Sequence, residues 1–218
     1  MIIGLSGKAY SGKDSFAKML IEREPVFENK KYSGKLKKVA GIIAGRSADD
    51  FEDPEVKNSV IFSGLTGRAL LIAIGQGLRE KIAKDIWVNA LLGNYEDHDM
   101  WVITDVRYTN EADAIKEKGG ILIRINRTAS VDEWNSMYDL GFGYATKKTK
   151  PISKEKWIDD FIVPDGGDKL YNELTHPSET ELDFYEFDHE FNCPTGLKNI
   201  KKSVDKFLAK IHNYYGSF

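Results

Sequence analysis

The sequence predicts an α/β fold with a central parallel sheet and helices on both faces. Short, continuous apolar runs at 2–5, 101–104 and 121–125 are typical of strands buried on both faces. Between the last two runs lies a helical pattern that Thr109 caps and glycines 119–120 end. A strand, a helix and a strand at this spacing form a βαβ unit, whose strands are parallel. A glycine-rich turn also joins the first run directly to a helical pattern.

Two helices are expected in the region that follows the first strand. Apolar residues at helical spacing over 16–21 predict the first helix, which fades before Pro25 because proline disfavours helix for its predecessor. A second helix is predicted over 36–44, since Gly45 follows its last apolar residue. Residues 46–66 are acidic and irregular in pattern, and we expect them to lie on the surface.

The remaining elements follow the same two periodicities. From 68 to 92 apolar residues recur about every fourth position, which predicts one long helix that Gly75 and Gly77 could bend or divide. A strand is predicted at 187–191. The last predicted helix, 197–211, carries its apolar residues on one face.

One segment interrupts this alternation of strands and helices. Residues 128–182 are polar, rich in Lys and Asp, and broken by prolines, and we interpret them as an insertion or lid. The whole chain, residues 1–218, is short enough to form a single domain that includes this segment.

Composition excludes several classes of protein. The 31 basic and 34 acidic residues give a net charge of −3, so no basic excess draws the chain to nucleic acid. Cys193 is the only cysteine, which excludes an intramolecular disulfide and a cysteine-based zinc cluster. Neither a signal-peptide pattern nor a run of roughly 18 apolar residues occurs, so we expect a cytoplasmic protein without a membrane partner.

The glycine-rich turn has the composition of a P-loop. It ends a strand and opens a helix, a context in which backbone N–H groups surround phosphate and the helix dipole adds positive potential. Lys13 can reach the β- and γ-phosphates, and Ser15 supplies a hydroxyl for magnesium, although Asp14 intervenes where the strict motif has Ser or Thr. The alternative is a glycine-rich turn with a surface lysine. The predicted phosphate-binding residues are Gly7, Lys8, Ala9, Tyr10, Ser11, Gly12, Lys13, Asp14 and Ser15.

Two charged residues follow the apolar run at 101–104. Asp105 is a candidate for orienting magnesium or its water ligands, because it ends a strand of the same predicted sheet; the alternative is a turn or cap residue. Arg107 lies two residues further along, near the edge at which ligands of open α/β sheets bind. The alternative for Arg107 is a solvated arginine.

Several segments together resemble one family. They are GKAYSGKDS in the loop, TDVRYTNEAD at 104–113, GGILIRINR at 119–127, the segment 68–89, and HPSE at 176–179. This combination is similar to the deoxynucleoside monophosphate kinases of bacteriophages and their bacterial relatives, and it spans most of the chain. The resemblance implies a P-loop NTPase three-layer fold of the nucleoside monophosphate kinase type. It also implies nucleotide partners and, for a phage-encoded protein, the host cytoplasm; a homodimer is one option.

The resemblance implies roles for individual residues. The loop would bind ATP or another nucleoside triphosphate with Mg²⁺, and residues 33–92 would form the monophosphate-binding region. Asp105 and Arg107 would lie between the two nucleotides. Arg127 would begin the lid at 128–182, whose counterpart in the family supplies cations to the transferring phosphoryl group. The residues implied for binding the monophosphate are Lys37, Arg68, Gln76, Arg79, Trp87 and Arg107.

The chain departs from the family pattern at two places. Where the family often has Leu-Gln before the glycine of the long helix, this chain has Leu71-Ile72, so a base contact is missing or is moved to Gln76. The stretch between Arg127 and His176 is also longer than the family pattern.

The predicted activity is transfer of a γ-phosphoryl group to a (deoxy)nucleoside 5′-monophosphate. Lys13, Arg107 and Arg127 would neutralise charge on the equatorial oxygens, while Ser15 and Asp105 position the metal. One alternative is a P-loop kinase for another small phosphate ester, such as one resembling phosphomevalonate. Another is a nucleotide-binding regulatory module, although such a module does not need the cations beyond the P-loop.

Overall fold

The computed structural model describes residues 1–8, 11–128, 180–194 and 196–216. The chain divides into two compact units, one formed by 1–29 with 100–218 and the other by 30–99. We call them the sheet unit and the helical unit. Most of the lid predicted at 128–182 lies outside the described residues.

The sheet unit is built on a five-stranded sheet with the order β2-β5-β1-β6-β7. Strand β1 pairs in parallel with both β5 and β6, and β6 pairs in parallel with β7. The residues of β1 are all buried, which explains why an uninterrupted apolar run forms a strand here. The strands are β1 (Ile2–Ser6), β2 (Glu28–Lys30), β5 (Trp101–Ile103), β6 (Ile121–Thr128) and β7 (His189–Pro194).

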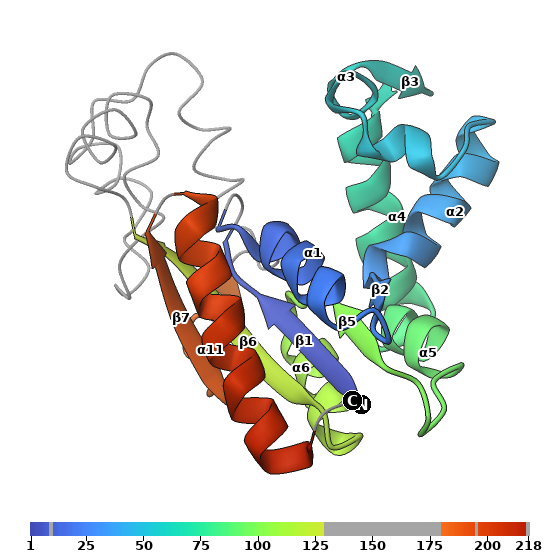
Figure 1. Cartoon of the computed structure of the whole chain (residues 1–218). Helices are drawn as coiled ribbons and strands as arrows, with labels where there is room; N and C mark the ends of the chain where they lie inside the picture. The colour runs from blue at the N-terminus through green and yellow to red at the C-terminus, as the bar shows by residue number, and fades with distance from the viewer. Residues whose placement is uncertain (9–10, 129–179, 195, 217–218) are drawn as a thin grey trace. The chain divides into compact units, whose positions relative to one another are not determined.

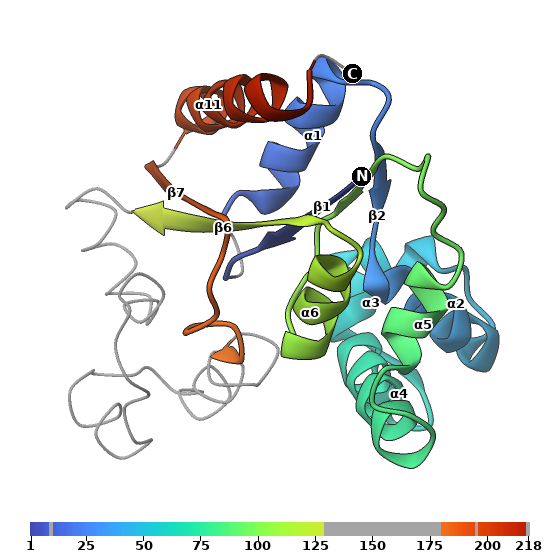
Figure 2. The same ribbon diagram turned by 90° about the horizontal axis from the view of Figure 1, so that it is seen from below.

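Helices cover both faces of this sheet (Figures 1 and 2). On one face lie α1 (Lys13–Arg23) and α11 (Leu197–Tyr215), and on the other lies α6 (Thr109–Glu117). Phe16 of α1 packs with its ring centroid 5.8 Å from that of Phe191 and 6.1 Å from that of Phe207. This three-layer arrangement confirms the predicted α/β fold of the P-loop type, and it brings the loop after β1 to the start of α1.

The helical unit has a smaller core, in which Phe51 is fully buried beside Ala40 and Leu70. Gly75 packs against the neighbouring helix, since a Cβ atom there would lie 3.3 Å from Leu36 Cδ2. The elements are α2 (Tyr32–Ala44), the 3₁₀-helix η1 (Asp49–Glu52), α3 (Pro54–Asn58), β3 (Val60–Phe62), β4 (Leu65–Thr66), α4 (Gly67–Lys81) and α5 (Ile86–Leu92).

Residues 46–66 are not irregular, so that part of the prediction is wrong, whereas all of them except Phe51 are exposed or half-buried as expected. They contain η1, α3 and the hairpin β3–β4, and Phe51 inside them is buried. Short-range side-chain bonds organise the stretch, because Asp50 Oδ2 accepts from the Ser47 N–H and Asp53 Oδ1 accepts from the Glu55 N–H. These are capping interactions that a search for apolar periodicity does not detect.

The long helix predicted from 68 to 92 is two helices, and the break is not at a glycine. Helix α4 ends at Lys81, where the N–H groups of Ile82 and Ala83 both donate to the Leu78 carbonyl. The bond from Ala83 spans five residues instead of the four of an α-helix, and such a bond ends the helix without a glycine. Gly75 instead lies inside α4, where the contact with the neighbouring helix requires a small residue.

Other boundaries differ by a few residues from those predicted. Helix α2 begins at Tyr32 instead of Leu36, and β7 spans 189–194 instead of 187–191. Helix α6 begins at Thr109, so its N-cap is Tyr108 and not Thr109. Strand β2 was not predicted, because only three residues pair at the sheet edge. Among the described residues, no helix has both the length and the apolar character needed to cross a membrane.

Candidate functional site

The loop between β1 and α1 has a shape that only glycine permits at two positions. Gly7 has φ 154° and Gly12 has φ 95°, values that L side chains rarely adopt. A Cβ atom on Gly7 would also lie 2.4 Å from the Ile125 carbonyl oxygen, and one on Gly12 would lie 2.9 Å from Ile200 Cδ1. The backbone of the loop therefore lies against β6 and α11 with no room for side chains at either glycine.

The interior of the loop is prepared for a negatively charged ligand. The Lys13 side chain is only 6% exposed, and its Nζ donates to the Lys8 carbonyl at 3.1 Å. Ser11 Oγ is also buried and has no hydrogen-bond partner among the described residues. Burial removes water from the Lys13 ammonium and from the Ser11 hydroxyl, and an anion bound in the loop can replace that lost solvation. The residues present therefore fit the polyphosphate of a nucleotide.

The remaining loop residues differ in how they are placed. Helix α1 begins at Lys13, and Gly12 offers no side chain to cap it, so the first-turn N–H groups face the loop with the positive end of the helix dipole. Asp14 is exposed and Ser15 is half-buried in this first turn. Ala9 and Tyr10 lie outside the described residues.

Asp105 lies at the end of the strand next to the loop. Strand β5 pairs with β1, with Ile103 opposite Gly4, and the Val106 N–H donates to the Leu5 carbonyl at 3.2 Å. Asp105 is therefore held beside the end of β1, because its neighbour Val106 bonds to Leu5, two residues before Gly7. Asp105 is half-buried.

The backbone at Arg107 is held by a carboxylate further along the chain. Glu111 is 2% exposed, and its Oε2 accepts from the Arg107 N–H at 2.9 Å and from the Tyr108 N–H at 3.2 Å. This carboxylate holds the turn that carries Arg107 and Asp105 toward the strand ends. A Glu in the first turn of a helix is the signal that could have revealed it.

Arg127 lies near the end of β6, where its backbone pairs with Cys193 of β7. Its side chain lies outside the part of the chain that the structure describes. The catalytic role implied for Arg127 therefore stays a prediction.

The residues implied for the monophosphate belong to the helical unit, apart from Arg107. Lys37 of α2 pairs with Glu52, and Lys57 lies 3.6 Å from the same carboxylate. Burial alone would raise the pKa of Glu52, but the hydrogen bond and charge of Lys37, with Lys31 and Lys57, hold it below its ordinary value. A ligand that binds Lys37 has to compete with this ion pair.

Helix α4 carries three of the other implied residues, Arg68, Gln76 and Arg79, along one side. Positions 76 and 79 return to within about 80° of position 68 around a helix with 3.6 residues per turn. Arg68 is exposed at the start of α4, and Gln76 and Arg79 are half-buried further along. Trp87 is 4% exposed, and its indole N–H donates to the Gly75 carbonyl at 3.1 Å, which ties α5 to α4. Its polar atom is thus used within the unit, so Trp87 would meet a ligand only with its ring.

A charged cluster beside the loop was missed entirely. Asp183 pairs with Lys8 of the loop and with Arg124 of β6. An arginine in the middle of an apolar strand was the available signal, because a charge in a buried strand requires a partner. The partner is 59 residues away in sequence, so spacing alone could not identify it.

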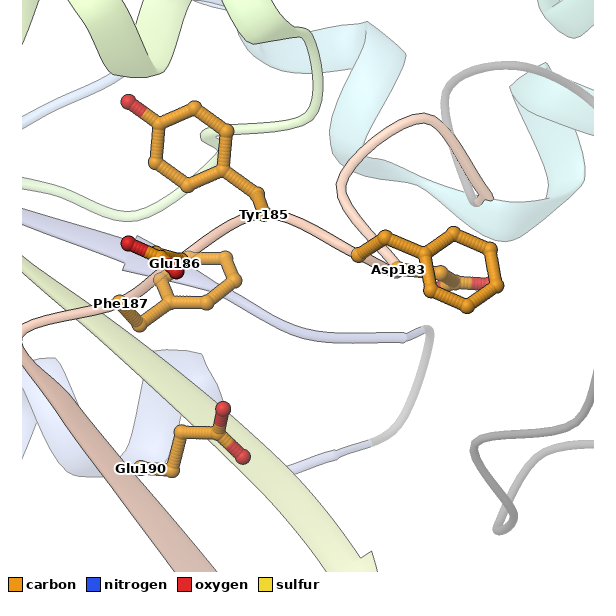
Figure 3. Close-up of a pocket in the computed structure, with 6 residues that line it drawn as sticks. Asp183, Tyr185, Glu186, Phe187 and Glu190 are labelled. Carbon is orange, nitrogen blue, oxygen red and sulfur yellow. The ribbon is translucent and has the colours of Figure 1, made fainter.

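The segment that carries Asp183 also borders a hollow of about 410 Å³ (Figure 3). Its lining combines three carboxylates with three aromatic rings, which makes it unsuited to the phosphates of a nucleotide. The lining residues are Asp183, Phe184, Tyr185, Glu186, Phe187 and Glu190.

Comparison with known proteins gives one informative relative. No protein-family model matches the chain. A protein of Acanthamoeba polyphaga mimivirus named "Putative deoxynucleotide monophosphate kinase" is 34% identical over 145 residues, which cover 58% of this chain and 74% of that protein. Solved structures of similar outline include the shikimate kinases of Aquifex aeolicus and Bacteroides thetaiotaomicron. Their TM-scores are 0.43 and 0.41, with 14% and 15% identity. These alignments cover 100% and 97% of this chain, and 100% and 98% of those chains.

The viral relative decides the family, because such low structural similarity carries no argument about function. Its identity extends over most of its own length. The glycine-shaped loop with a buried lysine agrees with it independently. On these grounds the chain belongs to the deoxynucleoside monophosphate kinase family, a family of phosphoryl-transferring enzymes.

Proposed function

We propose that this kinase transfers the γ-phosphoryl group of ATP, or of another nucleoside triphosphate, to a (deoxy)nucleoside 5′-monophosphate. The observation that carries the proposal is the buried Lys13 inside a loop whose two glycines leave no room for a side chain. The family to which the chain belongs supports the choice of a monophosphate as acceptor.

The donor site is assigned to the loop and the strand end beside it. The N–H groups of the loop and of the first turn of α1 would hold the β- and γ-phosphates. Lys13 would exchange its bond to the Lys8 carbonyl for a bond to phosphate. Ser15 and Asp105 would hold Mg²⁺ or its water ligands, and the ion would neutralise charge on the phosphates.

The acceptor site is assigned to the cations of the helical unit. Lys37, Arg68 and Arg79 would bind the monophosphate, with Gln76 and the ring of Trp87 available to the base. The acceptor phosphate is already an anionic nucleophile, so the reaction needs no general base. Its oxygen forms a bond to the γ-phosphorus while the bond to the β,γ-bridging oxygen breaks, and that oxygen leaves with the electron pair on the nucleoside diphosphate.

Charge neutralisation is the main task of this site, because the transferring group spreads charge over three equatorial oxygens. Lys13, Arg107 and Arg127 are assigned to this task. Preorganised cations of this kind are typically worth about 3 kcal/mol each in the transition state.

A panel of acceptors tests the proposal. The purified full chain is incubated with ATP and Mg²⁺ and with each of the common deoxynucleoside and ribonucleoside 5′-monophosphates. ADP release and the new diphosphate are then measured by chromatography. We expect ADP release to require at least one monophosphate and to match diphosphate formation one to one.

Two controls separate the alternatives. Lys13→Ala should lower turnover about a hundredfold while the circular dichroism spectrum stays native, which excludes a contaminating kinase. Phosphomevalonate in place of the nucleotide tests the other phosphate esters. Turnover with that ester alone, or nucleotide binding with no turnover on any acceptor, would contradict the proposal.

A further inference from the structure

Asp183 joins two cations beside the phosphate-binding loop. Its carboxylate lies 2.7 Å and 2.8 Å from Lys8 Nζ and 2.8 Å from Arg124 Nη2. Arg124 also donates to the Leu182 carbonyl at 3.0 Å, and its guanidinium lies 5.5 Å from the ring centroid of Phe187. The three charged side chains are 11% to 24% exposed, so solvent screens them only in part.

The segment that carries Asp183 is fastened along α6. Glu181 accepts from the Thr109 N–H at 2.8 Å, at the start of the helix. The Tyr185 hydroxyl donates to Asp113 at 2.8 Å, and its ring is turned toward α6 in Figure 3. Asp188 pairs with Lys116 at 2.6 Å and accepts from the Leu122 N–H at 2.7 Å. These three contacts follow one face of the helix, since positions 109, 113 and 116 are four and three residues apart.

The same network reaches the catalytic lysine through one residue of the loop. The Lys8 side chain is held by Asp183, while the Lys8 carbonyl accepts from Lys13 Nζ at 3.1 Å and from the Ser11 N–H at 3.2 Å. Lys8 is thus anchored at its side chain and in turn anchors two residues of the loop. Asp183 lies 175 residues from Lys8 in the sequence, so this ion pair ties the loop to the segment that runs along α6.

We propose that Asp183 is a positioning residue of the donor site, which holds the loop in a shape ready for a triphosphate. The proposal rests on the proposed function, because it takes the loop to be the donor site. Without the carboxylate, the Lys8 side chain loses this anchor, and part of the order of the loop has to form when the ligand binds. Ordering one such side chain costs affinity, so we expect Asp183→Asn to weaken binding of the donor about fivefold.

Asp188 provides a matched control. It is a carboxylate on the same segment, and it also pairs with one lysine and accepts one further hydrogen bond, but its contacts lie at the far end of α6. A merely structural role for the segment predicts the same effect from both asparagine variants. The positioning role predicts that Asp188→Asn lowers thermal stability and leaves the affinity for the donor unchanged.

The experiment measures the dissociation constant of a fluorescent ATP analogue with Mg²⁺ for the full chain and its variants. Asp183→Asn is also combined with Lys8→Met, because Asp183 acts through Lys8 in this proposal. In the Lys8→Met protein, Asp183→Asn should change the affinity for the analogue by less than about twofold, against about fivefold in the parent protein. Circular dichroism confirms the fold of each variant, and Asp183→Glu, which keeps the charge, should restore part of the affinity.

The outcomes are distinct. The positioning role would be overturned if Asp183→Asn and Asp188→Asn changed the affinity for the analogue equally. It would also be overturned if Asp183→Asn had the same effect in the parent protein and in Lys8→Met. Either result would leave the proposed function intact. A parent protein that binds no triphosphate would overturn both. If Asp183→Asn does not fold, Asp183→Glu is compared with Asp188→Glu, and a smaller loss of donor affinity should occur in the Asp183 variant alone.

Discussion

The sheet unit and the helical unit bury apolar residues to very different degrees. In the sheet unit, strands β1, β5, β6 and β7 and helices α1 and α11 share one buried cluster. In the helical unit, the cluster around Phe51 contains two other buried side chains, Ala40 and Leu70. Large exposed apolar side chains gather in the helical unit, which contains seven of the eleven found on the described chain: Ile42, Ile43, Val60, Phe62, Leu65, Ile72 and Ile82.

This difference suits the two halves of the proposed site. A loop that must hold phosphate in one geometry benefits from a rigid sheet beneath it. The helical unit has fewer buried contacts, so it is expected to open locally at lower free energy. Ion pairs such as Lys37–Glu52 contribute little to its stability at this exposure. The residues assigned to the acceptor therefore lie on the less stable scaffold.

The largest effect is expected from a phenylalanine in each core. Phe207 is fully buried and contacts Phe16 and Phe191, so Phe207→Ala should cost about 4 kcal/mol. That loss corresponds to roughly 10 °C in Tm for a chain of this size. Phe51→Ala should instead raise hydrogen exchange mainly within residues 30–99. Identical global destabilisation by both substitutions would show that the two units unfold as one.

The next effect tests the rigid donor side. Lys13→Ala should lower kcat/KM by about a hundredfold, equivalent to roughly 3 kcal/mol, because it removes one preorganised cation. Steady-state kinetics at saturating acceptor measures the loss, and Tm should change little. Unchanged turnover in a natively folded variant would remove the loop from the mechanism.

A smaller effect is expected on the acceptor side. Arg68→Lys keeps the charge but cannot form two parallel hydrogen bonds to phosphate, so the KM of the monophosphate should rise about tenfold. The affinity for ATP should stay the same. Arg46→Lys is the matched control, since Arg46 is exposed in the same unit and has no assigned role. Equal weakening of ATP and monophosphate binding would place Arg68 on the donor side.

The smallest effect is expected on the free energy of unfolding at low pH, through Asp188 in the sheet unit and Glu52 in the helical unit. Burial opposes ionisation of Asp188, but its bonds to Leu122 and Lys116 hold its pKa below the ordinary value of 3.8. The pKa of Glu52 is also held below its ordinary value of 4.5. A lowered pKa in the folded protein means stability that is present above the ordinary pKa and lost as the pH falls through the folded value.

Asp188→Asn should therefore cost about 1 kcal/mol at pH 7 and much less below pH 3. Glu52→Gln should have a smaller effect, since its side chain is 53% exposed. Urea unfolding between pH 3 and pH 7 measures both. A pH-independent loss in the Asp188 variant would mean that the hydrogen-bond geometry matters and the charge does not.

The elements that could be predicted are those whose local residue pattern matches the environment they have in the fold. The run at 2–5 forms β1 because both its faces are covered, and the glycine-rich turn forms the loop because its glycines have positive φ. Helix α11 follows its apolar face and only extends beyond 211. The regular elements within 46–66 could not be predicted, because they depend on side-chain caps and on one buried ring.

The sequence by itself determined the sheet strands, the phosphate-binding loop and the family resemblance, because each rests on residues that are close together in the chain. Only the tertiary structure decided which charges meet. Asp183 and Lys8 are 175 residues apart, and Arg124 reaches the same carboxylate from β6, which lies beside β1 in the sheet. A charge in a buried strand requires a partner, but pairing in space depends on how the strands are ordered. Spacing along the chain does not contain that order.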